Sequence, residues 1–396
     1  MHRLAIVASH PIQYHSPWYR RLTREVDLHV YYAHEASAED QAGAGFGVPF
    51  EWDTDLLEGY SYSWLPNRAR RPNVETFLGC NTPSVGAELT RRRYDAVLVH
   101  GWNLLCYWQA VHAAKSCCLP VMVRGDSHLQ TPRSSLRRII KRLAYPWLLG
   151  HFDAFLSVGH HNTEYLTVYR VCPDKIFHVP HCVDNEFFRA TAGSARGDLA
   201  GLRRRFHIPP DATVFLFVGK FLPRKRPLDF LAGLDRVKLR GKDVWGLLIG
   251  AGPLETQLRG HAARYATPCS FGGFLNQGQI AAAYALADAL VLPSNGEETW
   301  GLVVNEAMAC GVPAIVSDAV GCAPDLIVDG ETGFAYHEGE LDQLTTCMER
   351  LVADSTLRVR MAQQAAAHIQ TFSLDAACEG LLCALDSLML PRCGHE

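Results

Sequence analysis

The sequence has no long apolar run, no strong charge of either sign and no paired-cysteine motif. No uninterrupted apolar stretch approaches the ~18–20 residues of a membrane-spanning helix, so we expect no span. The net charge is only −3 in 396 residues, and no general affinity for polyanions follows. The thirteen cysteines form no Cys-x-x-Cys pair. Most of them are expected to be small core residues of a protein from a reducing compartment.

The sequence has no internal repeats or low-complexity tracts, and we expect no secretory signal. Met-His-Arg leads directly into Leu4–Ala8, an apolar run too short for a signal peptide. We therefore predict a cytoplasmic protein, with a position at the inner face of the membrane as an open alternative. The apolar content of 48% is typical of a globular protein. The length of 396 residues predicts two domains, because single hydrophobic cores stop growing near ~250–300 residues.

Apolar runs alternate with helical patterns along the chain, which predicts α/β domains whose parallel sheets are covered on both faces. Residues 37–60 are rich in glycine, alanine and acids and are expected to form a long loop. The expected strands are residues 4–8, 28–32, 96–100, 119–123, 152–158 and 176–180 in the first half, and 213–218, 245–250, 270–271, 289–292 and 314–316 in the second.

Two carboxylates, Glu298 and Glu306, stand eight residues apart in the string NGEETWGLVVNEAMACGVP. Glu298 is expected in a loop after a buried strand, and Glu306 inside a short helix over 301–310 that Gly311 ends. The free N–H groups at the start of this helix can hold a phosphate. Two glutamates alone also fit a helix cap and a solvated helix residue.

A basic turn, GKFLPRKRP, follows the expected strand at 213–218. It places Lys220, Arg224 and Lys225 near one strand end, where cations can neutralise a diphosphate and stabilise it as it leaves. A solvated basic turn is the alternative interpretation.

Polar residues also follow strands of the first half. His10 and Gln13 come after the first strand, where they can reach sugar or acceptor hydroxyls. Arg124 and Asp126 follow the strand at 119–123, and an ion pair with a structural role fits them equally well. Two histidines near a strand end do not make a metal site, which needs three ligands in fixed geometry, so none is predicted.

The segment RSSLRRIIKRL, residues 133–143, predicts a basic amphipathic helix. Its apolar face can contact an anionic membrane leaflet and bring the protein to a lipid-linked acceptor. The interpretation that we favour is a surface helix that packs its apolar side on the sheet.

These motifs resemble the retaining family 4 glycosyltransferases, which have the GT-B fold. The resemblance rests on Glu-x7-Glu followed by AMACGVP, and on VSDAVGCAPDLIVDGETGF downstream. It implies that Glu298 contacts the donor sugar and Glu306 the ribose hydroxyls. It also implies that the backbone at Gly301, Leu302 and Val303 faces the diphosphate. The string SHPIQYHSP resembles a His-Pro-Ile-Gln-Tyr branch of the same family.

The resemblance extends to the basic turn and to other strand ends. Lys220 takes the place of an arginine and Lys225 that of a lysine in the family's Gly-Arg-x4-Lys-Gly; the first exchange keeps the charge but loses the bidentate fork. Asp126 stands where many members have a histidine beside the reacting sugar. The other nucleotide-binding candidates are Gly219, Gly250, Gly252 and Phe274. The catalytic candidates are Glu298, Lys220, Lys225, Asp126, Arg124 and His10.

The resemblance implies two Rossmann-like domains that face a cleft. We predict an acceptor-binding domain over 1–188, a linker over 189–211 and a nucleotide-sugar-binding domain over 212–372. A C-terminal helix within 373–396 is expected to cross back to the first domain. Where the family has Gly-Gly-x-x-Glu, this chain has Val320-Gly321-Cys322 and Asp325.

The predicted function is transfer of a sugar, with retention, from a nucleotide-diphosphate sugar to a glycan, lipid-linked or small-molecule hydroxyl. UDP is the expected carrier and GDP the next, and no cofactor or metal is expected. A dinucleotide-dependent oxidoreductase needs a glycine-rich first turn, which this chain lacks. A non-catalytic nucleotide-sugar sensor stays open as the alternative, and no nucleic-acid partner is expected.

Overall fold

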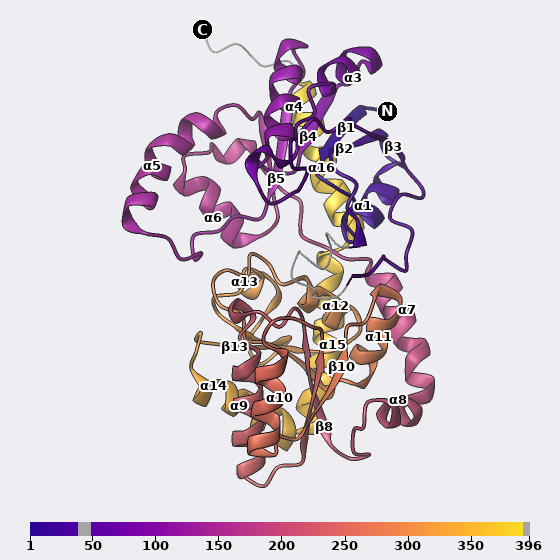
Figure 1. Ribbon diagram of the computed structural model, residues 1–396, viewed down its shortest axis with the longest axis vertical. Coiled ribbons are helices and arrows are strands. Elements are labelled where there is room, and N and C mark those ends of the chain that lie inside the picture. The colour runs from indigo at the N-terminus through magenta and orange to yellow at the C-terminus, as the bar shows by residue number, and fades with distance from the viewer. Residues whose placement is uncertain (39–48, 391–396) are drawn as a thin grey trace.

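The computed structural model describes residues 1–38 and 49–390 and contains two parallel sheets, each covered by helices (Figure 1). The first sheet has seven strands in the order β3-β2-β1-β4-β5-β6-β7, and the second has six in the order β10-β9-β8-β11-β12-β13. All of these pairings are parallel. The predicted pair of Rossmann-like α/β domains is confirmed.

The first sheet and its helices come from the N-terminal half of the chain. Its strands are β1 (Arg3–Ala8), β2 (Asp27–Tyr32), β3 (Ser61–Trp64), β4 (Ala96–Val99), β5 (Val121–Gly125), β6 (Ala154–Ser157) and β7 (Ile176–His178). Its helices are α1 (His15–Leu22), α3 (Val85–Arg92), α4 (Leu105–Ser116), α5 (Ser135–Leu149) and α6 (His160–Val168), with short 3-10 turns η2 (Phe77–Gly79) and η3 (Pro173–Lys175).

The second sheet comes from the C-terminal half. Its strands are β8 (Thr213–Val218), β9 (Val244–Ile249), β10 (Cys269–Gly273), β11 (Ala289–Leu292), β12 (Ala314–Ser317) and β13 (Gly333–Tyr336). The helical elements of this half are α7 (Asn185–Ala195), η4 (Arg196–Asp198), α8 (Leu199–Arg205), η5 (Pro223–Lys225), α9 (Pro227–Leu239), α10 (Glu255–Tyr265), α11 (Gln277–Leu286), α12 (Leu302–Ala309), α13 (Ala323–Leu326), α14 (Leu341–Ala353), α15 (Ser355–His368), η6 (Ile369–Thr371) and α16 (Leu374–Met389).

The central strands are apolar throughout because both of their faces are covered. In β1, Leu4 and Ile6 belong to the core on one face of the sheet, whereas Ala5 and Val7 belong to the core on the other. All four side chains are fully buried. This two-sided burial explains why the strand reads as a continuous apolar run without alternation.

The C-terminal helix α16 crosses back to the first domain, as predicted (Figure 1). It packs against α1 and β7, and its residues Ala377, Leu381 and Leu385 are fully buried in the core that covers β1. Residues 391–396 of the expected helical segment lie outside the described residues.

Two edge strands were not predicted. β3 carries the sequence SYSW, and its side chains are half-buried or exposed. β13 carries GFAY and begins at a glycine. These two short edge strands lack the continuous apolar run that marks the buried ones, so the pattern gave no signal for them. The expected loop 37–60 has no helix or strand over residues 49–60, and its residues 39–48 lie outside the described part.

The segment 189–211, which the composition suggested to be a linker, is largely helical. It contains most of α7, the turn η4 and α8. α7 packs against α11 and α12, and α8 packs against α11, all of which cover the second sheet.

The favoured interpretation of residues 133–143 was wrong. The helix forms as α5, over Ser135–Leu149, but Leu136, Ile140 and Leu143 are exposed and do not pack on the sheet. The buried side chain in the middle of the helix is instead that of Lys141. None of the helices in the described ranges has both the length and the apolar composition for a bilayer crossing.

Gly159, at the start of α6, lies at a tight contact between the two domains. A Cβ atom there would lie 2.4 Å from Cζ3 of Trp300 and 2.8 Å from Oδ2 of Asp325, both of which belong to the second domain. We expect Gly159→Ala to lower the free energy of unfolding by about 1–3 kcal/mol, as overpacking does, measured by chemical denaturation. Gly193→Ala, which adds a methyl group to an open helical position, is the control and should be neutral or slightly stabilising. Equal stability of the two variants would contradict this account of the interface.

Candidate functional site

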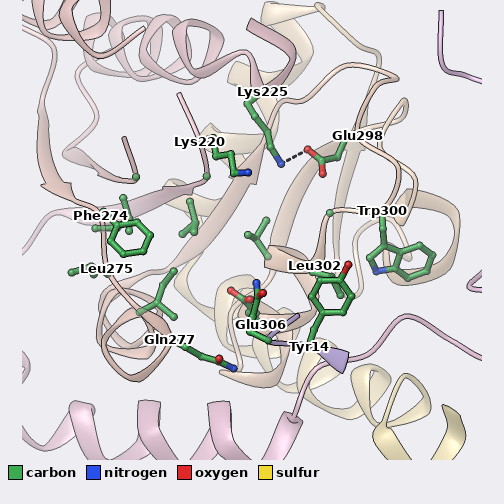
Figure 2. Close-up of a pocket in the computed structure, with 18 of the residues that line it drawn as sticks. Tyr14, Lys220, Lys225, Phe274, Leu275, Gln277, Glu298, Trp300, Leu302 and Glu306 are labelled. Atoms are coloured by element: carbon green, nitrogen blue, oxygen red, sulfur yellow. Dashed lines mark ion pairs between the residues drawn. The ribbon is translucent and has the colours of Figure 1, made fainter. Parts of the chain in front are cut away.

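A cavity of about 360 Å³ lies where the carboxyl ends of the two sheets face each other. Its walls come mostly from loops after β8, β9, β10 and β11 and from α12, and the first domain adds Gln13, Tyr14, Asp126 and His181. Figure 2 shows Lys220, Lys225 and Glu298 along one wall, Phe274 and Gln277 at one end and Trp300 at the other. Ligands of open α/β sheets bind at this edge.

The basic turn after β8 places three cations, Lys220, Arg224 and Lys225, on the cavity. Burial, together with the charges of Arg224 and Lys225, lowers the pKa of Lys220 to about 8. Concentrated positive charge at a partly dehydrated position favours an anionic ligand, because such a ligand relieves the mutual repulsion of the cations.

Lys225 forms an ion pair with Glu298, shown by the dashed line in Figure 2. Both side chains are mostly buried, with exposed fractions of 12% and 14%. Burial opposes ionisation of Glu298, but the charge of Lys225 and its hydrogen bond outweigh it, so the pKa of this carboxyl lies below its usual value. Glu298 is therefore a carboxylate at neutral pH.

Glu306 lies on α12, on the opposite side of the cavity from the lysines (Figure 2). Oη of Tyr284, from α11, donates a hydrogen bond to Oε2 of Glu306 at 2.6 Å. Burial raises the pKa of Glu306 to about 7, although the bond from Tyr284 acts in the other direction. A ligand that donates hydrogen bonds to this carboxylate would stabilise its charged form.

The first turn of α12 points its backbone N–H groups at the cavity between the two glutamates. Gly301, which precedes the helix, has φ +99° and gives no side-chain cap. A Cβ there would lie 2.8 Å from Cδ2 of Leu292, so this position requires glycine. Gly301, Leu302 and Val303 line the cavity, and their orientation suits an anion.

The end of the cavity beyond Glu306 is lined by apolar and aromatic groups. Phe274 packs against Phe50, with ring centroids 4.4 Å apart. Trp52, from the same segment of the first domain, also lines the cavity. Gly219 and Gly250 belong to the lining, whereas Gly252 does not and instead packs tightly on the backbone of Phe221.

A second cavity of about 210 Å³ opens in the first domain and shares Tyr14, Asp126 and His181 with the first. His10 and Arg124 line this cavity and not the larger one. The predicted residues therefore fall into two groups that meet at Asp126.

Arg124 is 4% exposed and donates hydrogen bonds to the carbonyl oxygens of Val179 and Pro180. Its charge and the burial around it keep the neighbouring imidazoles neutral. Burial and then Arg124 lower the pKa of His100 to about 3, and the pKa of His181 also lies well below its usual value. The second cavity thus offers neutral imidazoles beside one guanidinium, a set that suits hydroxyl groups.

Asp126 is held across the domain boundary. Oγ1 of Thr299 donates a hydrogen bond to its Oδ2 at 2.7 Å. Asp126 does not form an ion pair with Arg124 among the described contacts, so the structural ion pair considered from the sequence is not found. Because Thr299 follows Glu298 in the same loop, this hydrogen bond links the position of Asp126 to that of Glu298.

Several residues of the site were not predicted as such, among them Tyr14, Trp52, Gln277, Tyr284 and Trp300. Tyr14 lies in the His-Pro-Ile-Gln-Tyr string, so the motif could have identified it. Tyr284 and Trp52 stand far in sequence from every motif, and only the packing brings them to the cavity.

Asp325, at the altered Gly-Gly-x-x-Glu position, lies at the domain interface. The backbone N–H of His160 donates hydrogen bonds to both of its carboxylate oxygens at 3.0 Å. Asp325 thus accepts from the start of α6 and is not part of the cavity lining. Within residues 1–38 and 49–390, no cluster of three or more His, Cys, Asp or Glu has the arrangement of a metal site.

Solved glycosyltransferase structures share this architecture over nearly the whole chain. A glycosyltransferase from Rickettsia africae matches with a TM-score of 0.75 at 13% identity, covering 98% of this chain and 100% of that one. Anabaena HepE in complex with UDP and glucose matches with a TM-score of 0.70 at 15% identity, with the same coverage. Sucrose-phosphate synthase from Thermosynechococcus elongatus matches with a TM-score of 0.72 at 17% identity, covering 98% and 99%. The chain has the GT-B fold.

Sequence comparison gives the family. The profile described as glycosyl transferases group 1 matches residues 201–368. The D-inositol 3-phosphate glycosyltransferase of Actinosynnema mirum is 34% identical over 311 residues, which are 75% of this chain and 68% of that protein. That of Thermomonospora curvata is 30% identical over 312 residues, 74% and 67% of the two chains. This chain belongs to the group 1 glycosyl transferases.

The raised pKa of Glu306 predicts a pH-dependent cost of folding. Between the ordinary glutamate pKa and about 7, the folded chain holds a proton that the unfolded chain has lost, so the free energy of unfolding falls as pH rises. We expect Glu306→Gln to remove this fall. Relative to wild type, the variant should gain about 1–2 kcal/mol between pH 5.5 and pH 8, less than full burial would give because the carboxyl borders an open cavity.

The measurement is urea denaturation of both proteins across this pH range. The buried histidines titrate in both proteins, so the difference between them isolates Glu306. A difference that does not change with pH would contradict the raised pKa.

Proposed function

We propose that this chain is a retaining glycosyltransferase of family 4, in its His-Pro-Ile-Gln-Tyr branch. It moves a sugar from a nucleotide-diphosphate sugar to an acceptor hydroxyl. The observation that carries the proposal is that one cavity joins two lysines, the open start of α12 and two separated glutamates. The lysines and the start of α12 match a diphosphate, and the two glutamates match a sugar on one side of it and a ribose on the other.

In the proposed donor complex, the diphosphate lies between Lys220, Lys225 and the N–H groups of Leu302 and Val303. Glu298 accepts from hydroxyls of the donor sugar, and Glu306 from those of the ribose. The base then reaches the apolar end near Phe274. UDP is the preferred carrier and GDP the second, and the UDP held by Anabaena HepE supports this order.

The acceptor hydroxyl enters from the second cavity and is oriented by Asp126, with His10 and Arg124 near it. In a front-face displacement, its oxygen bonds to the anomeric carbon on the side from which the diphosphate leaves. The bond from that carbon to the diphosphate oxygen breaks, and the acceptor proton passes to that departing oxygen. The lysines and the helix N-terminus stabilise the leaving charge, and we propose that no metal ion takes part.

The acceptor class is a glycan, a lipid-linked sugar or a small metabolite, in surface glycan, glycolipid or metabolite synthesis. The relatives named for D-inositol 3-phosphate support a polyhydroxylated acceptor. The neutral imidazoles of the second cavity fit such hydroxyls.

The donor assignment predicts which variants lose the nucleotide. With a panel of nucleotide sugars, the one that raises the melting temperature of wild type should stabilise Lys225→Ala and Glu306→Ala far less. Loss of one charged contact should weaken binding by about 10- to 100-fold in calorimetry. Each variant is compared with its own unliganded form, because Lys225→Ala also leaves Glu298 without its partner.

Lys242→Ala, which removes an exposed lysine of the same domain, is the control and should bind like wild type. If no nucleotide sugar or nucleoside diphosphate stabilises wild type at millimolar concentration, the donor proposal fails. Binding without transfer to any acceptor, and without donor hydrolysis, would favour a nucleotide-sugar sensor.

The affinity for the nucleotide should also depend on pH through Glu306. The ribose hydroxyls donate to the carboxylate, whereas the free site is half protonated near pH 7. The dissociation constant of the nucleotide should therefore fall about fivefold from pH 6 to pH 8 in wild type, because Lys220, with a pKa of about 8, loses part of its charge at pH 8 and offsets part of the gain. Glu306→Gln should bind more weakly and lose this dependence. A wild-type affinity that stays constant over this range would contradict the ribose assignment.

A further inference from the structure

An ordinary surface helix buries its apolar face, whereas helix α5 exposes it. The side chain buried at its centre is that of Lys141, whereas its large apolar side chains face outward. The helix lies at the side of the first domain next to α6, away from the second domain (Figure 1). We call the outward side chains the α5 outer face. They are Leu136 (68% exposed), Ile139 (58%), Ile140 (54%), Leu143 (77%) and Trp147 (73%).

The orientation of α5 is fixed by specific contacts. Nζ of Lys141 donates a hydrogen bond to Oη of Tyr165 at 2.8 Å. The same ammonium lies 4.3 Å from the ring centroid of Tyr145 and 5.6 Å from that of Tyr169. Cation–π contacts of this kind hold a lysine where an aliphatic residue is usual. The contact with Tyr145 lies within α5, but turning the helix to bury its outer face would break the contacts of Lys141 with Tyr165 and Tyr169.

The outer face is a continuous stripe. Residues 136, 140, 143 and 147 recur every three or four positions, which places them on one side of the helix. Exposed patches of this kind on a folded chain mark a surface that contacts another partner.

The charge around the stripe has one sign. Arg133, Arg137, Arg138 and Arg142 are exposed, and no aspartate or glutamate occurs between Asp126 and Asp153. At 3.6 residues per turn, Arg137 and Arg142 lie on opposite flanks of the stripe. A second copy of the same face would bring these cations against their like, so the surface is complementary to an anionic partner.

We propose that the α5 outer face docks on a bilayer that contains anionic lipids. The apolar side chains enter the boundary between headgroups and acyl chains, with Trp147 at that level, and the flanking arginines contact lipid phosphates. The helix lies in the plane of the membrane surface and does not cross it.

The docking surface is connected to the second cavity. β5 ends at Gly125, Asp126 lines both cavities, and residues 127–134 then lead directly into α5. Docking through α5 would thus hold the acceptor side of the cleft near the membrane. The docking does not depend on the proposed transfer, whose donor-side residues lie elsewhere.

The test is sedimentation of the full chain with vesicles of phosphatidylcholine, with and without about 30% phosphatidylglycerol. Wild type should sediment with the anionic vesicles and not with the neutral ones, and added salt should weaken the binding. Leu143→Ser combined with Trp147→Ser should lower the partition coefficient by roughly tenfold or more. Arg137→Gln combined with Arg142→Gln should lower it similarly and reduce the salt dependence.

The control is Leu239→Ser combined with Val359→Ser, which removes two exposed apolar side chains from helices of the second domain. It should bind vesicles like wild type. Nucleotide binding by all variants, measured by thermal shift, shows that they are folded and tests the donor site separately.

Equal binding of wild type to neutral and anionic vesicles, or no binding to anionic vesicles at low salt, would overturn the proposal. So would a finding that the α5 variants convert a dimer of the chain into monomers without changing vesicle binding, since a second copy would then cover this face.

Discussion

The contact between segment 298–306, a loop followed by the start of α12, and the strand ends of the first domain determines the geometry of the site. Trp300 packs against the ring of His181, with centroids 5.4 Å apart, and Asn305 donates a hydrogen bond to the carbonyl oxygen of His181 at 3.0 Å. Nε1 of Trp300 in turn donates to Oδ1 of Asn305. The same segment carries Glu298, in the loop, and Glu306, on α12. The packing that joins the two domains therefore also positions both carboxylates. A change in this interface would move Glu298 and Glu306 as well.

Burial in the cavity shifts the pKa values of its charged groups. Burial moves the pKa of Lys220 downward and that of Glu306 upward, so each group is shifted toward its neutral form. The pairing of Lys225 with Glu298 keeps a further two charges in place. Opposed shifts of this kind in one cavity are typical of functional sites.

The sequence predicted best the features that a single local pattern identifies, such as an apolar run for a buried strand or an ordered motif for a site residue. β8 was predicted at its observed bounds because a buried central strand is a plain apolar run. Glu298 and Lys225, which both line the cavity, were proposed as site residues because each lies in an ordered motif. Their ion pair was not predicted, since it joins segments more than seventy residues apart. The edge strands β3 and β13 gave no pattern, whereas the edge strands β7 and β10 were predicted. The orientation of α5 was mispredicted because periodicity identifies an apolar face but not what covers it, and the partner of Lys141 is a set of tyrosines contributed partly by α6.

Helix α16 has a consequence for the order in which the protein is made. The core on one face of the first sheet contains residues of β1 and of α16, the first and last elements of the described chain. α16 packs on α1, β6 and β7, so during synthesis this part of the face stays uncovered while the second domain emerges and folds. The N-terminal domain is thus completed only after the second domain has been translated, and the apolar surface of β6 and β7 beneath α16 is open to chaperones until then.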